Sequence, residues 1–168
     1  HAPAVNVEVH LSKGLPGFSM VGLPEKAVKE SKDRVRSAII NCGFKFPSKR
    51  IVVNLSPADL PKEGGRFDLP IAIGILLASE QLPPQNMADF EIAGELALSG
   101  ELRGFAGALP LALATQKQQR TLIIPKDNAA EVALLSQLKS YSAEHLLQVC
   151  QHFLGEQPLP LLAKNTVV

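Results

Sequence analysis

The sequence predicts an α+β (α/β-like) domain in which a mixed β-sheet is layered with helices. The chain has 168 residues, of which 46% are hydrophobic and 20% are charged, a balance typical of one folded domain rather than a disordered segment. Strand patterns come first, before residue 22. From residue 50 onward, strand patterns alternate with helix patterns, as they do in folds that lay helices on a sheet.

The first elements are two strands and a helix. Apolar residues alternate with polar ones over 5–11, which predicts a half-buried strand. A glycine- and proline-rich turn separates it from a second strand, 18–21, which we expect to pair with the first. A helix then begins near Pro24 and stops at Gly43. Its apolar stripe consists of Val28, Ser31, Val35, Ala38, Ile39 and Cys42.

The remaining elements alternate along the chain. A continuous apolar run predicts a strand at 51–55, and a buried helix follows at 68–79. Further strands are expected at 90–97, 101–103, 121–124 and 138–141, and further helices at 109–119, 126–135 and 142–154. Ser142 is a candidate N-cap for the last helix. After residue 154 the chain contains Pro158 and Pro160 and no clear period, so we expect a domain at 1–154 and a linker at 155–168 leading toward a further domain.

Composition excludes several classes of protein. Lys and Arg number 17 against 16 Asp and Glu, so a uniformly basic nucleic-acid binder is excluded and any such role needs a local patch. The sequence lacks the run of apolar residues that crosses a bilayer, so no membrane partner is expected. Cys42 and Cys150 are far apart and the four histidines are scattered, which favours a reducing cytoplasm and predicts no metal site.

The longest irregular segment, 56–67, leads into the buried helix at Asp68. Loops of this length are usually functional or mobile. Gly64 and Gly65 would permit its backbone shape, and Asp68 would cap the helix start. A phosphate cradle is disfavoured because Asp68 would repel the anion. The Walker A spacing G-x-x-x-x-G-K-[ST] is absent from the sequence.

Basic residues concentrate between positions 26 and 66, where ten Lys and Arg accompany four acidic residues. Lys29, Lys32 and Arg36 fall on one helix face, which could meet DNA phosphates or an acidic partner, or be an ordinary solvated face. Lys62 and Arg66 would add charge from the loop. Few aromatic rings lie nearby in the sequence to stack on bases. A serine and a lysine could form a nucleophile–base pair, and Ser19, Ser56 and Ser99 lie in or beside predicted loops. None of these serines lies in a G-x-S-x-G elbow.

Three long segments resemble one family. They are GLPGFSMVGLP at 14–24, NLSPADLPKEGGRFDLP at 54–70 and GELALSGELR at 94–103. In this order they resemble the N-terminal domain of ComM/YifB proteins, bacterial AAA+ ATPases often called magnesium-chelatase-like. The resemblance extends to about Leu154. It implies a fold like the Lon protease catalytic domain, placed ahead of an AAA+ motor.

The resemblance also implies a function for the whole protein. Such proteins act as hexameric, ATP-driven branch-migration helicases in DNA recombination and natural transformation. ATP and Mg would bind in the AAA+ domain, outside this sequence, so no cofactor is expected here; the partners would be that motor domain, other copies of the chain and possibly DNA.

The Lon comparison bears on catalysis. Asp68 stands where a Lon-type serine would begin a helix, and Leu109 and Pro110 stand where the lysine is expected. An aspartate is not activated as a serine hydroxyl is. The resemblance therefore predicts a non-catalytic accessory domain that presents DNA or helps ring assembly, with Arg66 bridging to a phosphate or a neighbouring subunit and Asp68 orienting Arg66. The alternatives are a Lon-like serine peptidase with an unrecognised nucleophile and a pure oligomerisation module.

Overall fold

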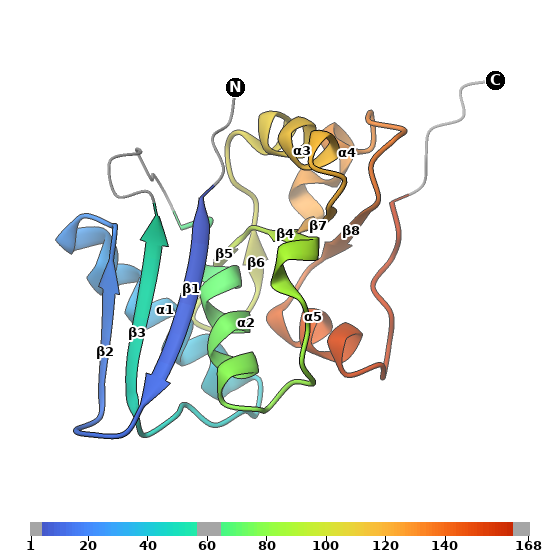
Figure 1. Ribbon diagram of the computed structural model, residues 1–168. Coiled ribbons are helices and arrows are strands. Elements are labelled where there is room, and N and C mark those ends of the chain that lie inside the picture. Colours follow the sequence, from blue (N-terminus) through green and yellow to red (C-terminus); the bar gives the residue numbers. More distant parts are fainter. Residues whose placement is uncertain (1–4, 57–64, 163–168) are drawn as a thin grey trace.

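The described part of the chain forms two three-stranded sheets and a two-stranded hairpin, with five α-helices packed against them (Figure 1). The computed structural model describes residues 5–56 and 65–162. The first sheet contains β1 (Asn6–Ser12), β2 (Gly17–Val21) and β3 (Arg50–Ser56), and the second contains β4 (Phe90–Ile92), β7 (Thr121–Pro125) and β8 (Ser140–Ala143); the hairpin joins β5 (Glu95–Leu96) to β6 (Leu102–Arg103). The helices are α1 (Glu25–Asn41), α2 (Asp68–Ala78), α3 (Ala108–Lys117), α4 (Ala129–Val132) and α5 (Leu146–Phe153). The predicted α+β class, with mixed strand directions and helices, is confirmed.

The first sheet has β3 at its centre, in the order β1-β3-β2. Strand β1 is antiparallel to β3, with Val9 opposite Val53, and β2 is parallel to β3. The predicted pairing of the first two strands was therefore wrong. The connection at 13–16 crosses the end of the sheet where β3 starts, so β1 and β2 lie on opposite sides of β3. Helix α1 then joins β2 to β3, as a helix commonly does between two parallel strands.

Helices α1 and α2 supply much of the core of this half. The predicted stripe of α1 is confirmed, since Ser31, Val35, Ala38 and Ile39 are buried. Helix α2 is apolar on nearly all sides and is buried, as the sequence predicts. It packs on β1 so closely that a Cβ on Gly74 would lie 2.6 Å from Val9 Cγ2. Glycine is therefore required at this point of the interface.

The second sheet is all-parallel, in the order β4-β7-β8. The strand predicted at 90–97 is divided, because Gly94 leaves the sheet to bond with the start of α2: its N–H donates to Arg66 O and its carbonyl accepts from Leu69 N–H. The helix predicted at 126–135 shortens to a 3-10 turn, Lys126–Asn128, followed by α4. The last helix begins at Leu146, and His145, rather than Ser142, is its N-cap: His145 Nδ1 accepts from Leu147 N–H.

Residues 160–162 lie alongside β8. Leu159 is buried, and its N–H donates to His152 Nδ1 at 2.9 Å. Ser142 N–H donates to Pro160 O, and Leu162 N–H donates to Ser140 O. The packed part of the domain therefore reaches Leu162, past the boundary expected at 154. None of the helices in the described ranges is long and apolar enough to span a membrane.

Candidate functional site

Asp68 is the first residue of α2, as predicted, but its carboxylate does not cap the helix. It points toward α1 and accepts four hydrogen bonds. Oδ2 accepts from Arg34 Nε at 2.6 Å and from Leu96 N–H at 3.1 Å, and Oδ1 accepts from Ser31 Oγ at 2.7 Å and from Arg34 Nη2 at 3.2 Å. These bonds use the four acceptor positions that a carboxylate offers. The partner of Asp68 is therefore Arg34 and not Arg66.

The Arg34–Asp68 pair lies between the two helices. Asp68 is almost fully buried, whereas the Arg34 side chain keeps one fifth of its surface exposed. Burial raises the pKa of the Asp68 carboxyl, and the hydrogen bonds from Arg34 and Ser31 act in the opposite direction. Burial also opposes the charge of Arg34, but Asp68 and Glu95 raise the pKa of that guanidinium. The position that would carry a Lon-type nucleophile thus carries part of a structural ion pair.

The loop end next to this pair is tightly packed. A Cβ on Gly65 would lie 2.5 Å from Glu95 Cγ and 3.0 Å from Arg34 Nη2. Gly65 is buried, so a side chain there would displace one of the two charged residues. The predicted site residues Lys62 and Gly64 lie outside the described residues.

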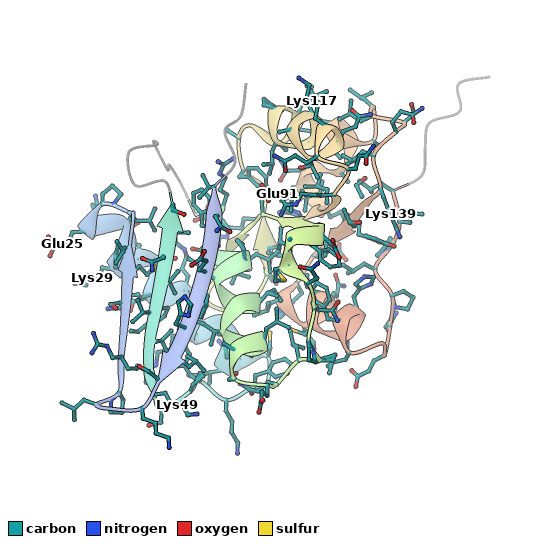
Figure 2. All side chains as sticks on the ribbon, viewed as in Figure 1. Glu25, Lys29, Lys49, Glu91, Lys117 and Lys139 are labelled. Carbon is teal, nitrogen blue, oxygen red and sulfur yellow. The ribbon has the colours of Figure 1, made fainter. Side chains whose placement is uncertain are left out.

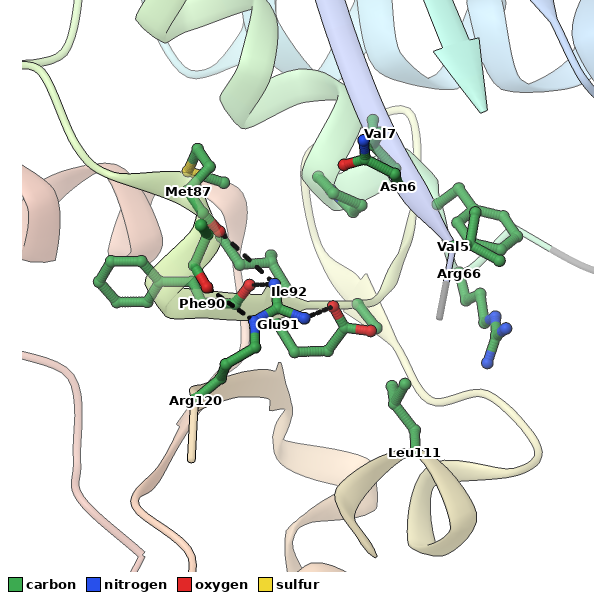
Figure 3. Close-up of a pocket in the computed structure, with 14 residues that line it drawn as sticks. Val5, Asn6, Val7, Arg66, Met87, Phe90, Glu91, Ile92, Leu111 and Arg120 are labelled. Atoms are coloured by element: carbon green, nitrogen blue, oxygen red, sulfur yellow. Dashed lines mark hydrogen bonds and ion pairs between the residues drawn. The ribbon is translucent and has the colours of Figure 1, made fainter. Parts of the chain in front are cut away.

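Arg66 is half-exposed and lies over the Phe67 ring, with 4.9 Å between its Cζ and the ring centroid. It lines a pocket together with Glu91 and Arg120 (Figure 3). Arg120 is held in place by carbonyl oxygens of Ala88 and Phe90 and by the Glu91 carboxylate, 3.3 Å from its Nη1. Burial raises the pKa of Glu91, while Arg120 and Arg66 lower it. This pocket therefore combines two cations with one half-buried carboxylate.

The segment expected to carry a catalytic lysine begins α3. Leu109 is half-buried and Pro110 is exposed there, beside the same pocket wall at Leu111. Within residues 5–56 and 65–162, no hydrogen bond joins a serine hydroxyl to a lysine amine. Over the same ranges, no three His, Cys, Asp or Glu residues are grouped so that they could hold a metal ion.

The three predicted cations of α1 do share one side of the helix. Lys29 and Arg36 are exposed and Lys32 is half-buried. Lys32 Nζ lies 5.9 Å from the centroid of the Phe18 ring, and Arg36 Cζ lies 5.5 Å from that of Phe46. This basic face (Lys29, Lys32 and Arg36) therefore flanks the buried stripe rather than lying opposite to it.

The sequence places Phe44, Phe46 and Phe67 near the basic residues, and the fold adds the ring of Phe18. Phe18 comes from β2 and Phe46 from the segment before β3, and their ring centroids are 5.5 Å apart. Phe18 lies two residues before the buried Met20 and therefore on the same inward face of β2, so the strand period could have indicated that it turns toward α1.

A groove lies beside the basic face. Its lining residues include three phenylalanines and three cations but no carboxylate: Pro16, Gly17, Phe18, Arg36, Ile40, Phe44, Lys45, Phe46, Pro47, Ser48 and Lys49. Lys29 and Lys49 project from this half of the molecule, whereas Lys117 and Lys139 lie on the other half (Figure 2). We call the groove lined by Phe18, Phe44 and Phe46 the Phe18–Phe46 groove.

The family model for subunit ChlI of Mg-chelatase matches residues 7–128. The chain belongs to this family. It is 61% identical to the competence protein ComM of Haemophilus influenzae over 160 residues, which is 95% of this chain and 31% of that protein. It is 55% identical to the YifB protein of Escherichia coli over 159 residues, again 31% of the relative. The resemblance to ComM/YifB proteins is confirmed, and the chain spans about a third of the length of these ChlI-family relatives.

A more distant relative bears on the fold of this ChlI-family chain. The chain is 25% identical to the Lon protease of Brevibacillus choshinensis over an alignment of 168 residues. This alignment covers 92% of the chain and 21% of the protease. This match agrees with the predicted likeness to Lon.

Proposed function

We propose that the chain is a non-catalytic accessory domain of a ComM-like AAA+ ATPase in competence and DNA recombination, and that its basic face presents DNA to the motor. The name of one relative, the competence protein ComM of Haemophilus influenzae, supports this process. The matched third of those relatives leaves room for a motor domain outside this chain. The whole protein would be a cytoplasmic hexamer.

One observation carries the DNA contact. Lys29, Lys32 and Arg36 lie side by side on α1 and continue into a groove whose lining contains further cations and no acid. Cations in such a row attract a phosphate backbone and release its counterions on binding. The pocket at Arg66 is less suited to binding DNA phosphates, because the Glu91 carboxylate, which would repel them, lines it.

Cofactor chemistry would belong to the motor. ATP and Mg would bind in the AAA+ domain, because this chain carries no Walker A segment and its described carboxylates form no metal-binding group.

The structure offers a matched test of the basic face. The triple variant Lys29→Glu, Lys32→Glu, Arg36→Glu should bind a labelled DNA oligonucleotide at least about tenfold more weakly at low salt, since it replaces three attractive charges with repulsive ones. The control is Arg103→Glu, Lys117→Glu, Lys139→Glu, which makes the same change of net charge at exposed positions away from α1. Fluorescence anisotropy, repeated over a series of salt concentrations, measures both.

Each outcome of these experiments supports or overturns the proposal. Loss of binding in the α1 triple variant but not in the control supports it. Equal effects of both triples, or binding independent of salt, overturns it. A stable ring in sedimentation without DNA retention would instead indicate an oligomerisation module, and peptide turnover abolished by Ser56→Ala or Ser99→Ala would indicate a Lon-like peptidase.

A further inference from the structure

We infer that the Phe18–Phe46 groove binds single-stranded nucleic acid, with bases stacking on its rings and phosphates lying on its cations. This inference rests on the proposed function and names the form of DNA that the domain would take. Nothing in the basic face alone selects between single and double strands, because phosphate contacts are present in both.

The rings provide the selection. Phe18 and Phe46 lie 5.5 Å apart with a tilt of 41° between their planes, and Phe44 lines the same groove. All three rings are half-buried, so each keeps part of its surface open. Bases in a duplex are already stacked on one another, whereas the unpaired bases of a single strand can stack on aromatic side chains without sequence preference.

The cations are arranged around these rings. Lys32 and Arg36 lie over Phe18 and Phe46, respectively. The planar guanidinium of Arg36 is itself a surface on which a base can stack. Lys45 and Lys49 are exposed and line the same groove, so they can meet the phosphates between successive bases. The groove thus alternates stacking surfaces with positive charge, as single-strand sites do.

Two other pockets in the described part of the chain lack this combination. The pocket at Glu101 and His145 contains three carboxylates, those of Glu101, Asp127 and Glu144, with Lys126 as its one lysine. The pocket at Gln148 and Gln151 contains no aromatic ring. An acidic peptide would fit the charge of the Phe18–Phe46 groove but would leave its three rings without a planar partner.

The chain contains no tryptophan, which permits a direct test of stacking. The variant Phe46→Trp places the single tryptophan of the chain in the groove. Oligo(dT) of about 16 nucleotides should quench its fluorescence, since a base that stacks on the excited indole can accept an electron from it. A second reporter, Phe105→Trp, lies against the smaller core cluster under α3 and should not be quenched.

A second measurement separates stacking from charge. The double variant Phe18→Leu, Phe46→Leu keeps apolar side chains but removes two rings. It should bind the oligonucleotide about ten- to a hundredfold more weakly with an unchanged salt slope, whereas Arg36→Gln, Lys49→Gln should lower that slope by about 0.7 per lost contact. Phe105→Leu is the matched control, and circular dichroism confirms that each variant is folded.

The outcomes separate this inference from the proposed function. Quenching in Phe46→Trp, with tighter binding of the single strand than of the same sequence as duplex, supports the inference. Equal binding of single strand and duplex, unaffected by the leucine variants but lost in the α1 triple variant, overturns the inference and leaves the proposed function standing. Retention of polyglutamate in preference to the oligonucleotide overturns both.

Discussion

Arg34 of α1 and Asp68 of α2 join the two helices through a buried ion pair, with 2.6 Å between Arg34 Nε and Asp68 Oδ2. Ser31 and the Leu96 N–H complete the hydrogen bonds of the carboxylate. The pair therefore connects α1, α2 and β5 in a single polar network. Within such a network, the loss of one member leaves the others buried without partners.

Replacing Arg34 or Asp68 alone should strongly lower the free energy of unfolding. Arg34→Met leaves the Asp68 carboxylate buried without its counter-charge, and should lower the free energy of unfolding by about 3–5 kcal/mol. The double variant Arg34→Met, Asp68→Leu should recover much of that loss, because an apolar pair of similar volume replaces the charges. Urea unfolding measures both. Glu30→Gln, at an exposed neighbour of Arg34, is the control and should change stability by less than about 0.5 kcal/mol; a single-partner loss no larger than this would contradict the prediction.

Gly74 tests the packing of α2 on β1. Alanine normally favours a helix over glycine by about 1 kcal/mol, yet a Cβ here would lie 2.6 Å from Val9 Cγ2. Gly74→Ala should therefore destabilise the domain by about 1–3 kcal/mol. In the background Val9→Ala, where the opposing methyl groups are absent, the same change should stabilise it. Thermal unfolding of the four proteins gives the sign, and a destabilisation that persists in the Val9→Ala background would refute this account.

His152 should make stability depend on pH. Its Nδ1 must be neutral to accept the Leu159 N–H, and burial, together with Lys139, lowers its pKa. Because the folded pKa lies below the unfolded value of about 6.5, this stability is present above that pH and is lost as the pH falls. The free energy of unfolding should drop between about pH 7 and pH 5. The drop should be smaller in His152→Gln and unchanged in His10→Gln, which alters an exposed ring.

Cys150 should act at the opposite end of the pH scale. Burial, with a contribution from Cys42, raises the pKa of its thiol to about 12. An unfolded thiol ionises near about 8.5, so the contribution to stability is present below that pH and is lost as the pH rises. Up to about 1.4 kcal/mol per pH unit should be lost above it. Cys150→Ala should show a shallower decline than the parent chain in unfolding experiments at alkaline pH; parallel curves would mean that the thiol is not responsible.

Local patterns predicted the elements better than their arrangement. The alternation over 5–11 and the stripe of α1 depend on neighbours in the sequence, and both were confirmed. The order β1-β3-β2 depends on the insertion of a later strand between two earlier ones, which no local pattern encodes. Ser142 has good N-cap chemistry, but it lies in β8, and the helix starts later, where His145 Nδ1 accepts from Leu147 N–H.

The candidate site was limited in the same way. The side of α1 that carries Lys29, Lys32 and Arg36 follows from helical spacing alone. The partner of Asp68 lies 34 positions earlier in the sequence, and the Phe18–Phe46 contact joins two separate segments. Such contacts arise from tertiary packing. The basic face could therefore be predicted as a stripe of charge but not as the border of an aromatic groove.

Strand β7 divides the interior of the protein into two compartments. Ile123 belongs to the larger cluster, with α1 and α2, whereas its neighbours Leu122 and Ile124 belong to a smaller one under α3 and α4. Because successive side chains of a strand point to opposite faces, this short strand contributes to both clusters and separates them. We therefore expect α3 and α4 to unfold locally, together with the smaller cluster, while the larger cluster stays folded. Amide hydrogens of α3 should then exchange earlier than those of α2, and the two rates would report two separately melting parts of one small domain.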